Sequence, residues 1–135
     1  MKYLLDTNVC IALINGSSEK VRRRYMQAER DSAFAISAMV LHELQYGIAK
    51  SELVAQNARA LEAFLQRGIA VLDFGSIAAL TAAKIRVDLE RKGKRIGEYD
   101  TLIAGHALAE NLVLVTANAR EFNRVRGLTL EDWTI

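Results

Sequence analysis

A chain of 135 residues, of which 51% are hydrophobic and 25% charged, has the length and composition of one globular domain with its own core. These proportions exclude a disordered chain, and no apolar run approaches the roughly 20 residues of a transmembrane helix. A formal net charge of +2 does not by itself indicate nucleic-acid binding. We expect a single domain over residues 1–135 and, since the start does not resemble a signal peptide, a cytoplasmic location.

Short apolar strands alternate with helices along the chain. Strands are predicted at Tyr3–Leu5, Phe34–Ile36, Ala70–Leu72 and Val113–Val115, with a weaker one near Leu128–Leu130. Helices are predicted at Val9–Ile14, Glu19–Ala28, Ala38–Ala49, Leu53–Gln66, Ile77–Lys92 and Tyr99–Glu110. This alternation predicts an α/β fold, with a parallel sheet covered by helices on both faces.

The first strand and the first helix meet at Asp6, in the stretch MKYLLDTNVCIALING. A short polar residue at such a joint is often only the N-cap of the helix, but Asn8 is the better-placed cap. Asp6 is then left at the carboxyl end of the first strand. Ligands of open α/β sheets bind at that edge.

Two further acids lack a partner on their own helix. A surface acid commonly has a basic residue three or four positions away, as Glu62 and Asp88 do. Glu43 and Asp100 have only uncharged neighbours at those spacings, so we expect both to face inward. A divalent cation such as Mg²⁺ or Mn²⁺, which prefers oxygen ligands, could hold both together with Asp6. The alternative is that each acid pairs with an arginine from a distant element.

A fourth polar position follows a later strand. In VLVTANAREF, the strand Val113–Val115 is followed by Thr116 and Asn118, which repeats the layout around Asp6. Asn118 with Glu121 three residues later also fits an N-cap with a capping box. The two roles are compatible.

These segments together resemble a known family. LLDTN, Glu43 in MVLHELQYG, IGEYDTLIAGHA around Asp100, TANAREF and the closing GLTLEDW stand in the order found in PIN-domain ribonucleases, and more narrowly in the VapC toxins of bacterial toxin–antitoxin pairs. The resemblance implies a three-layer α/β/α sandwich with a central parallel sheet. It implies that Asp6, Glu43 and Asp100 bind metal and that Asn118 fills a fourth catalytic position. Thr7, Asn8 and Thr116 match polar residues that orient the site.

The resemblance also implies an activity and partners. Members of the family are endoribonucleases that use Mg²⁺ or Mn²⁺, form dimers and are held inactive by a VapB antitoxin. The C-terminal pattern is similar to that of the members that cut initiator tRNA in the anticodon region. Two departures matter: Glu98 stands where many relatives carry proline, and Asn118 is neutral, so the number of metal ions stays open. The alternative is a PIN-like scaffold that binds RNA or a partner without cutting.

Basic residues gather shortly before Asp100. Residues 84–95 hold six basic residues against two acids, and the run ends five residues before Asp100. Such runs are usually solvated helix faces. We nevertheless assign RNA-backbone binding to Arg91, Lys92, Lys94 and Arg95. His106 is interpreted as structural rather than as a general base, and Trp133 as a residue of the packing or of an interface.

Overall fold

The computed structural model describes residues 2–135. Its strands are β1 (Lys2–Leu5), β2 (Ala33–Ser37), β3 (Ile69–Leu72), β4 (Val113–Val115) and β5 (Leu130–Glu131). Its helices are α1 (Thr7–Asn15), α2 (Glu19–Ala28), α3 (Ala38–Ala49), α4 (Val54–Leu65), α5 (Ser76–Arg91), α6 (Glu98–Ala109) and α7 (Ala119–Phe122). Among the helices of residues 2–135, none combines the length and apolar character that a membrane span needs.

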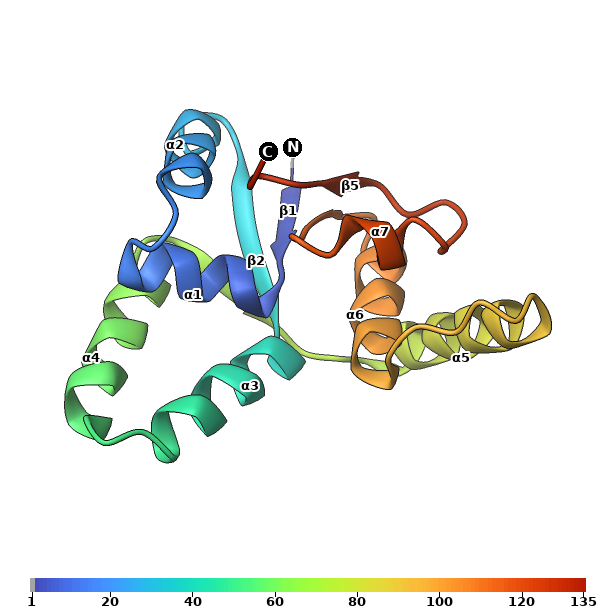
Figure 1. Ribbon diagram of the computed structural model, residues 1–135, viewed down its shortest axis with the longest axis horizontal. Coiled ribbons are helices and arrows are strands. Elements are labelled where there is room, and N and C mark those ends of the chain that lie inside the picture. The colour runs from blue at the N-terminus through green and yellow to red at the C-terminus, as the bar shows by residue number, and fades with distance from the viewer. Residues whose placement is uncertain (1) are drawn as a thin grey trace.

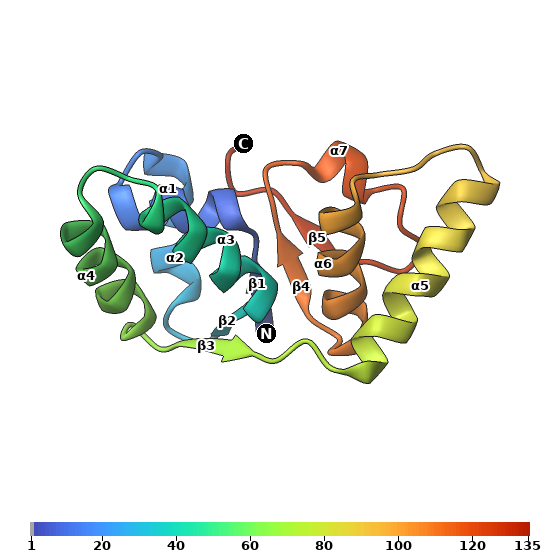
Figure 2. The same ribbon diagram turned by 90° about the horizontal axis from the view of Figure 1, so that it is seen from below.

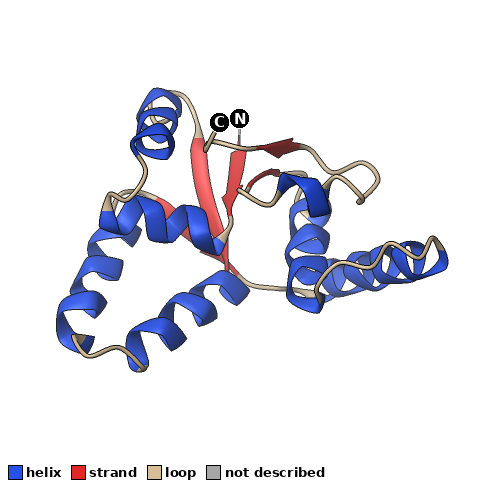
Figure 3. Cartoon of the chain, in the orientation of Figure 1, coloured by secondary structure: helices blue, strands red, loops and turns tan. Residues whose placement is uncertain are grey.

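The five strands form one parallel sheet in the order β3-β2-β1-β4-β5. Figures 1 and 2 show α1 to α4 on one side of this sheet and α5 to α7 on the other, and Figure 3 marks the strands between the helices. The predicted α/β/α sandwich is therefore confirmed. The chain builds outward from β1 to β3, then returns to place β4 on the other side of β1, so the strand order reverses between β1 and β4. Ligands of such sheets bind at this point of reversal.

The predicted elements are confirmed in type and order, with two differences. The short helix α7 was not predicted, because its four residues are too few to show a helical period. Strand β5 lies at Leu130–Glu131 rather than at Leu128–Leu130. The inner strands β1 and β4 are almost wholly buried, which explains their continuous apolar runs.

The prediction that Asn8 caps the first helix is wrong. Helix α1 begins at Thr7, and Asp6 is its N-cap, with an extended backbone and with Oδ1 accepting a hydrogen bond from the Thr7 amide at 2.8 Å. Asn8 lies inside the first turn and is exposed. The cap is therefore the residue at the exact strand–helix joint, where the backbone is still extended.

An aromatic cluster packs near the amino ends of the strands. Trp133 is buried and meets the rings of Tyr3 and Phe34 edge to face, with centroids 5.3 and 6.3 Å away. Its indole Nε1 donates to Glu131 Oε1 at 2.9 Å. The interpretation of Trp133 as a packing residue is confirmed, and this part of the core lies at the opposite end of the sheet from Asp6.

Helices α5 and α6 cross in close contact at Gly105. A Cβ placed on Gly105 would lie 2.6 Å from the Cβ of Ala82 and 2.7 Å from its backbone. Only glycine permits this approach, because real Cβ atoms do not come so near other heavy atoms. The contact fixes α6, which carries Asp100, against the long helix α5.

Candidate active site

The topology brings the predicted site residues to one edge of the sheet. Asp6 follows β1, and Thr116 follows β4, its parallel neighbour. Helix α3, which carries Glu43, begins directly after β2. Helix α6 runs back toward the start of β4, so its first turn, with Asp100, also lies at the carboxyl edge (Figure 2). Four distant segments therefore place residues along the edge where α/β sheets bind ligands.

Asp6 is held by hydrogen bonds to both carboxylate oxygens. Besides the bond from the Thr7 amide to Oδ1, Oδ2 accepts from the buried hydroxyl of Thr116 at 2.8 Å. The Thr116 hydroxyl in turn accepts from the amide of Asn118 at 3.0 Å. These bonds orient Asp6 and join the segment after β1 to the segment after β4.

The side chain of Asn118 turns toward carboxylates. Its Nδ2 donates to Glu121 Oε2 at 3.0 Å and approaches Asp100 Oδ2 at 3.5 Å. Asn118 is at the N-cap position of α7, but its side chain caps no amide. The predicted capping box is therefore wrong, because two carboxylates attract the side-chain NH₂ that faces them. Glu121, which was interpreted only as part of that box, is the site residue that sequence reasoning missed.

The carboxylates at this edge crowd one another. Burial, then the charges of Asp6 and Glu121, raise the pKa of Asp100 from 3.8 to about 6, although the hydrogen bond from Asn118 opposes the rise. Within residues 2–135, no ion pair joins Asp6, Glu43, Asp100 or Glu121 to a basic side chain. The alternative in which each acid pairs with a distant arginine is therefore not found. The site holds negative charge without a balancing cation in the described chain.

Glu43 stands on the other side of the site. It is half-buried at the wall of a mostly apolar hollow of about 280 Å³ among α1, α3 and α4. On the same helix, the carbonyl oxygen of Met39 accepts a hydrogen bond from the hydroxyl of Tyr99, which precedes Asp100 on α6. Burial and then the charges of Glu43, Asp6 and Asp100 raise the pKa of Tyr99, so this hydroxyl remains protonated and able to donate.

The acids share an edge without forming a closed ligand cluster. In the described residues, no three Asp, Glu, His or Cys side chains are placed so as to hold one metal ion. The structure thus brings Asp6, Asp100, Asn118 and Glu121 together and leaves Glu43 across the site. Thr7 has a buried hydroxyl without a partner in residues 2–135, and Asn8 is exposed, so the orienting roles assigned to them stay predictions.

The basic run before α6 is partly engaged in ion pairs. Lys92 Nζ lies 2.9 Å from Asp88 Oδ2, whereas Arg91 and Lys94 are exposed and form no ion pair within residues 2–135. The carbonyl of Arg95 accepts from Arg124 Nη1 at 2.9 Å. That bond places a further guanidinium, which the sequence did not indicate, beside the predicted RNA-binding run.

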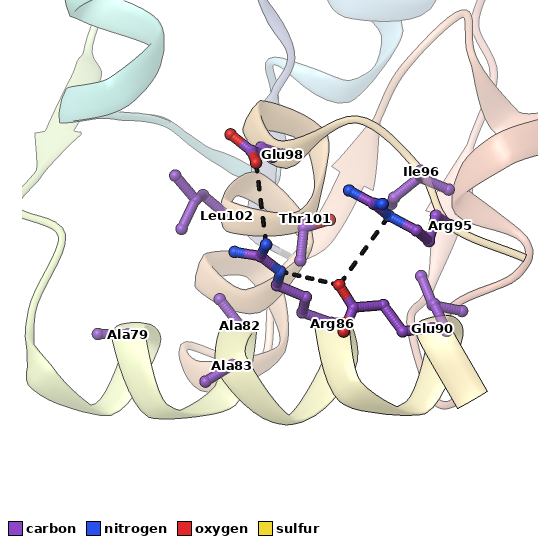
Figure 4. A pocket seen from close by; sticks show the side chains of 11 residues that line it. Ala79, Ala82, Ala83, Arg86, Glu90, Arg95, Ile96, Glu98, Thr101 and Leu102 are labelled. Atoms are coloured by element: carbon purple, nitrogen blue, oxygen red, sulfur yellow. Dashed lines mark hydrogen bonds and ion pairs between the residues drawn. The ribbon is translucent and has the colours of Figure 1, made fainter. Parts of the chain in front are cut away.

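Figure 4 shows a hollow of about 300 Å³ between α5, α6 and the loop that joins them. Ala79, Ala82 and Leu102 contribute apolar lining, and a chain of ion pairs joins the charged residues of the lining. Arg86 Nε lies 3.2 Å from Glu90 Oε2 and its Nη2 lies 3.9 Å from Glu98 Oε1, while Arg95 Nε lies 3.9 Å from Glu90 Oε2. Glu98 is thus exposed and paired with Arg86, and it does not contribute to the raised pKa of Asp100.

His106 is buried on α6, away from the acids of the site, and its Nε2 lies 3.8 Å from Oε2 of Glu110. Neither ring nitrogen has a hydrogen-bond partner in residues 2–135, and the ring packs edge to face on Phe74 at 5.4 Å. Burial lowers the pKa of His106. These surroundings agree with the predicted structural role.

The fold is an α/β/α sandwich with a parallel sheet. Its candidate site is acidic and consists of crowded carboxylates and one amide side chain at the carboxyl edge of that sheet. Residues 3–128 match the family model of the PIN domain. A tRNA(fMet)-specific endonuclease VapC from Shigella flexneri is 42% identical over 134 residues, 99% of each chain, and a ribonuclease VapC2 from Rickettsia felis is 42% identical over 133 residues, 98% of each chain. The chain belongs to the PIN-domain family and, within it, to the VapC proteins.

Solved structures agree with this assignment. VapBC2 from Rickettsia felis, bound to a DNA fragment from its promoter, matches with a TM-score of 0.91 at 41% identity over 98% of this chain and 99% of that chain. VapBC-1 from nontypeable Haemophilus influenzae matches with a TM-score of 0.88 at 34% identity over the whole of both chains. The resemblance noted in the sequence is confirmed.

Proposed function

We propose that this chain is an endoribonuclease toxin that depends on Mg²⁺ or Mn²⁺ and that a VapB-type antitoxin holds inactive. The observation that carries the proposal is the crowding at the carboxyl edge, where burial and then the charges of Asp6 and Glu121 raise the pKa of Asp100, and no ion-paired cation in residues 2–135 offsets the charge of these acids. A bound divalent cation relieves this kind of repulsion. The names of the VapC relatives support the ribonuclease activity.

The donor set fits such an ion. Asp6, Glu43 and Asp100 offer only carboxylate oxygens, the ligands that Mg²⁺ and Mn²⁺ prefer, and Glu121 adds a fourth. These residues would hold the metal after movements that bring them together. The bound ion would supply a water of lowered pKa and stabilise charge on the phosphate oxygens during cleavage of a phosphodiester bond.

The residues around the acids prepare them for this role. Thr116 and the Thr7 amide fix both oxygens of Asp6, so Asp6 has its orientation before any ligand arrives. Asn118 is neutral and donates hydrogen bonds, so it lowers the repulsion between Asp100 and Glu121 without adding charge. Its NH₂ group could equally donate to a phosphate oxygen.

For the substrate we propose RNA, and specifically initiator tRNA cut in the anticodon region. VapC proteins from Shigella flexneri and Salmonella typhimurium, 42% and 43% identical to this chain, are named tRNA(fMet)-specific endonucleases. Arg91, Lys92, Lys94 and Arg95 would hold the RNA backbone. Replacing Lys94 and Arg95 by Gln should weaken RNA binding and reduce its salt slope by about 1–2. An unchanged salt slope would show that these residues form an ordinary solvated surface and do not bind the RNA backbone.

The proposed partners are a VapB-type antitoxin and a second copy of this chain, within the cytoplasm. Solved VapBC complexes share the fold of this chain along nearly its full length. For the homodimer, α5 exposes the apolar side chains of Ile77 and Leu80, of which 70% and 57% of the surface is accessible. Light scattering of the purified chain tests the dimer.

Cleavage of total bacterial tRNA is the test of the proposed activity. Wild type is assayed with Mg²⁺ and with EDTA, beside Asp6→Asn and, as a matched control, Asp31→Asn, whose exposed carboxylate precedes β2 and forms no ion pair within residues 2–135. We expect discrete fragments from wild type and Asp31→Asn in Mg²⁺ only. Full activity of Asp6→Asn would overturn the mechanism. Mg²⁺ binding without cleavage would favour the alternative, a scaffold that binds RNA without cutting it.

A further inference from the structure

The two helices that carry Glu43 and Asp100 belong to opposite layers of the sandwich. Helix α3 lies with α1 and α4, and α6 lies with α5 across the sheet (Figures 1 and 2). Within residues 2–135, a single side-chain hydrogen bond joins α3 to α6, from the hydroxyl of Tyr99 to the carbonyl of Met39. This bond therefore spans the site between the acids.

The acceptor of this bond belongs to the turn that positions Glu43. Met39 lies in the first turn of α3, where its amide donates to the Oγ of the buried N-cap Ser37 at 3.1 Å. In an α-helix the carbonyl of Met39 also accepts from the amide of the residue four positions later, which is Glu43. Tyr99 thus contacts the same peptide oxygen that anchors the backbone of Glu43.

The donor is equally well placed at the other end. Tyr99 directly precedes Asp100 in the first turn of α6, and it is half-buried. Apart from burial, the charges of Glu43, Asp6 and Asp100 act on its hydroxyl.

We propose that Tyr99 is a positioning residue that sets the place of Glu43 relative to Asp6 and Asp100. The inference rests on the proposed function, because it concerns the metal that these acids would hold. The acids do not form a closed cluster, so binding an ion must bring Glu43 toward the others. A fixed link between α3 and α6 limits how far the two helices separate. Groups that orient ligands in this way typically change metal affinity by about 10–100-fold when they are removed.

The test is Mn²⁺ binding to the purified chain, followed by electron paramagnetic resonance of the free ion. Tyr99→Phe removes only the hydroxyl, and Tyr46→Phe is the matched control, since Tyr46 is exposed on α3 and its hydroxyl has no hydrogen bond in residues 2–135. We expect Tyr99→Phe to raise the Kd for Mn²⁺ by about tenfold and Tyr46→Phe to leave it unchanged. RNA cleavage by Tyr99→Phe should recover at saturating Mn²⁺. An unchanged Kd overturns the inference.

A double-mutant cycle distinguishes positioning from a general loosening of the fold. If Tyr99 acts through Glu43, then Tyr99→Phe has little further effect on the Kd in a Glu43→Gln background. Equal effects in both backgrounds overturn the inference, including when Tyr99→Phe also lowers the melting temperature. Absence of Mn²⁺ binding by wild type would instead overturn the proposed function itself, and this inference with it.

Discussion

Replacing Asp100 by Asn should stabilise the metal-free protein at neutral pH. The pKa of Asp100 is raised to about 6 by burial and by the charges of Asp6 and Glu121, so its ionised form is disfavoured in the folded state. An amide of the same shape removes that charge and retains a polar contact with Asn118. A carboxylate that the proposed metal site uses is therefore expected to reduce the stability of the fold when no metal is bound.

The expected gain in the free energy of unfolding is about 1 kcal/mol. A rise in the pKa from 3.8 to about 6 corresponds to about 3 kcal/mol at roughly 1.4 kcal/mol per unit. The side chain is only half-buried, so solvent screening reduces this value severalfold. Between about pH 4 and pH 6 the folded protein keeps a proton that the unfolded chain has lost, so stability falls as the pH rises through this range. The gain in stability from Asp100→Asn is therefore complete above about pH 6 and vanishes below about pH 4.

Urea unfolding in EDTA at about pH 7 and about pH 4 measures this effect. Glu98→Gln is the matched control, because Glu98 lies in the same turn but is exposed and pairs only weakly with Arg86; we expect changes within about 0.5 kcal/mol at both pH values. Mg²⁺ should then stabilise wild type more than Asp100→Asn. A variant that is less stable than wild type at neutral pH in EDTA would refute the reasoning.

Three further changes test the packing and the hydrogen bonds. Gly105→Ala should lower the free energy of unfolding by about 1–3 kcal/mol, because the new Cβ would lie 2.6 Å from that of Ala82. Gly47→Ala is the control, because a Cβ at Gly47 has nothing within 4 Å; it should raise the free energy of unfolding by up to about 1 kcal/mol in the same urea titration. Thr116→Val should cost about 1–2 kcal/mol and weaken Mn²⁺ binding about tenfold; an unchanged Mn²⁺ affinity would show that the bond to Asp6 is not needed. Burial lowers the pKa of His106, so the unfolded chain takes up that proton first as the pH falls below about 6.5. The stability of His106→Leu relative to wild type should therefore rise toward pH 5, and a pH-independent difference would contradict this.

The arrangement of the strands and helices was predictable because it depends on patterns within short segments. Strands β1 and β4 are buried on both faces, so they read as continuous apolar runs. The lack of an ion pair at Glu43 and Asp100 was also predictable, since each lacks a cation on its own helix face. Both signals need only residues within four positions of one another.

The errors arose where contacts between distant segments decide the outcome. Capping rules favoured Asn8 and a box between Asn118 and Glu121, because those rules consider only neighbours in sequence. In the structure Thr116 binds Asp6 across 110 positions, and Asp100 lies within reach of Asn118 across 18. Those contacts turn the side chains toward the site. The hydrogen bond from Tyr99 to Met39 spans 60 positions, and neither local segment has a sequence pattern that predicts it.

The placement of the acids explains how the fold tolerates them. The aromatic cluster of Trp133, Tyr3 and Phe34 packs near the amino ends of the strands, whereas the carboxylates gather at the opposite edge. Repulsion among the carboxylates therefore acts at the rim, where solvent and small movements reduce it, and does not reach the aromatic packing. If the proposed function holds, a metal ion reverses that repulsion, so the same edge that weakens the free protein should strengthen the metal-bound one.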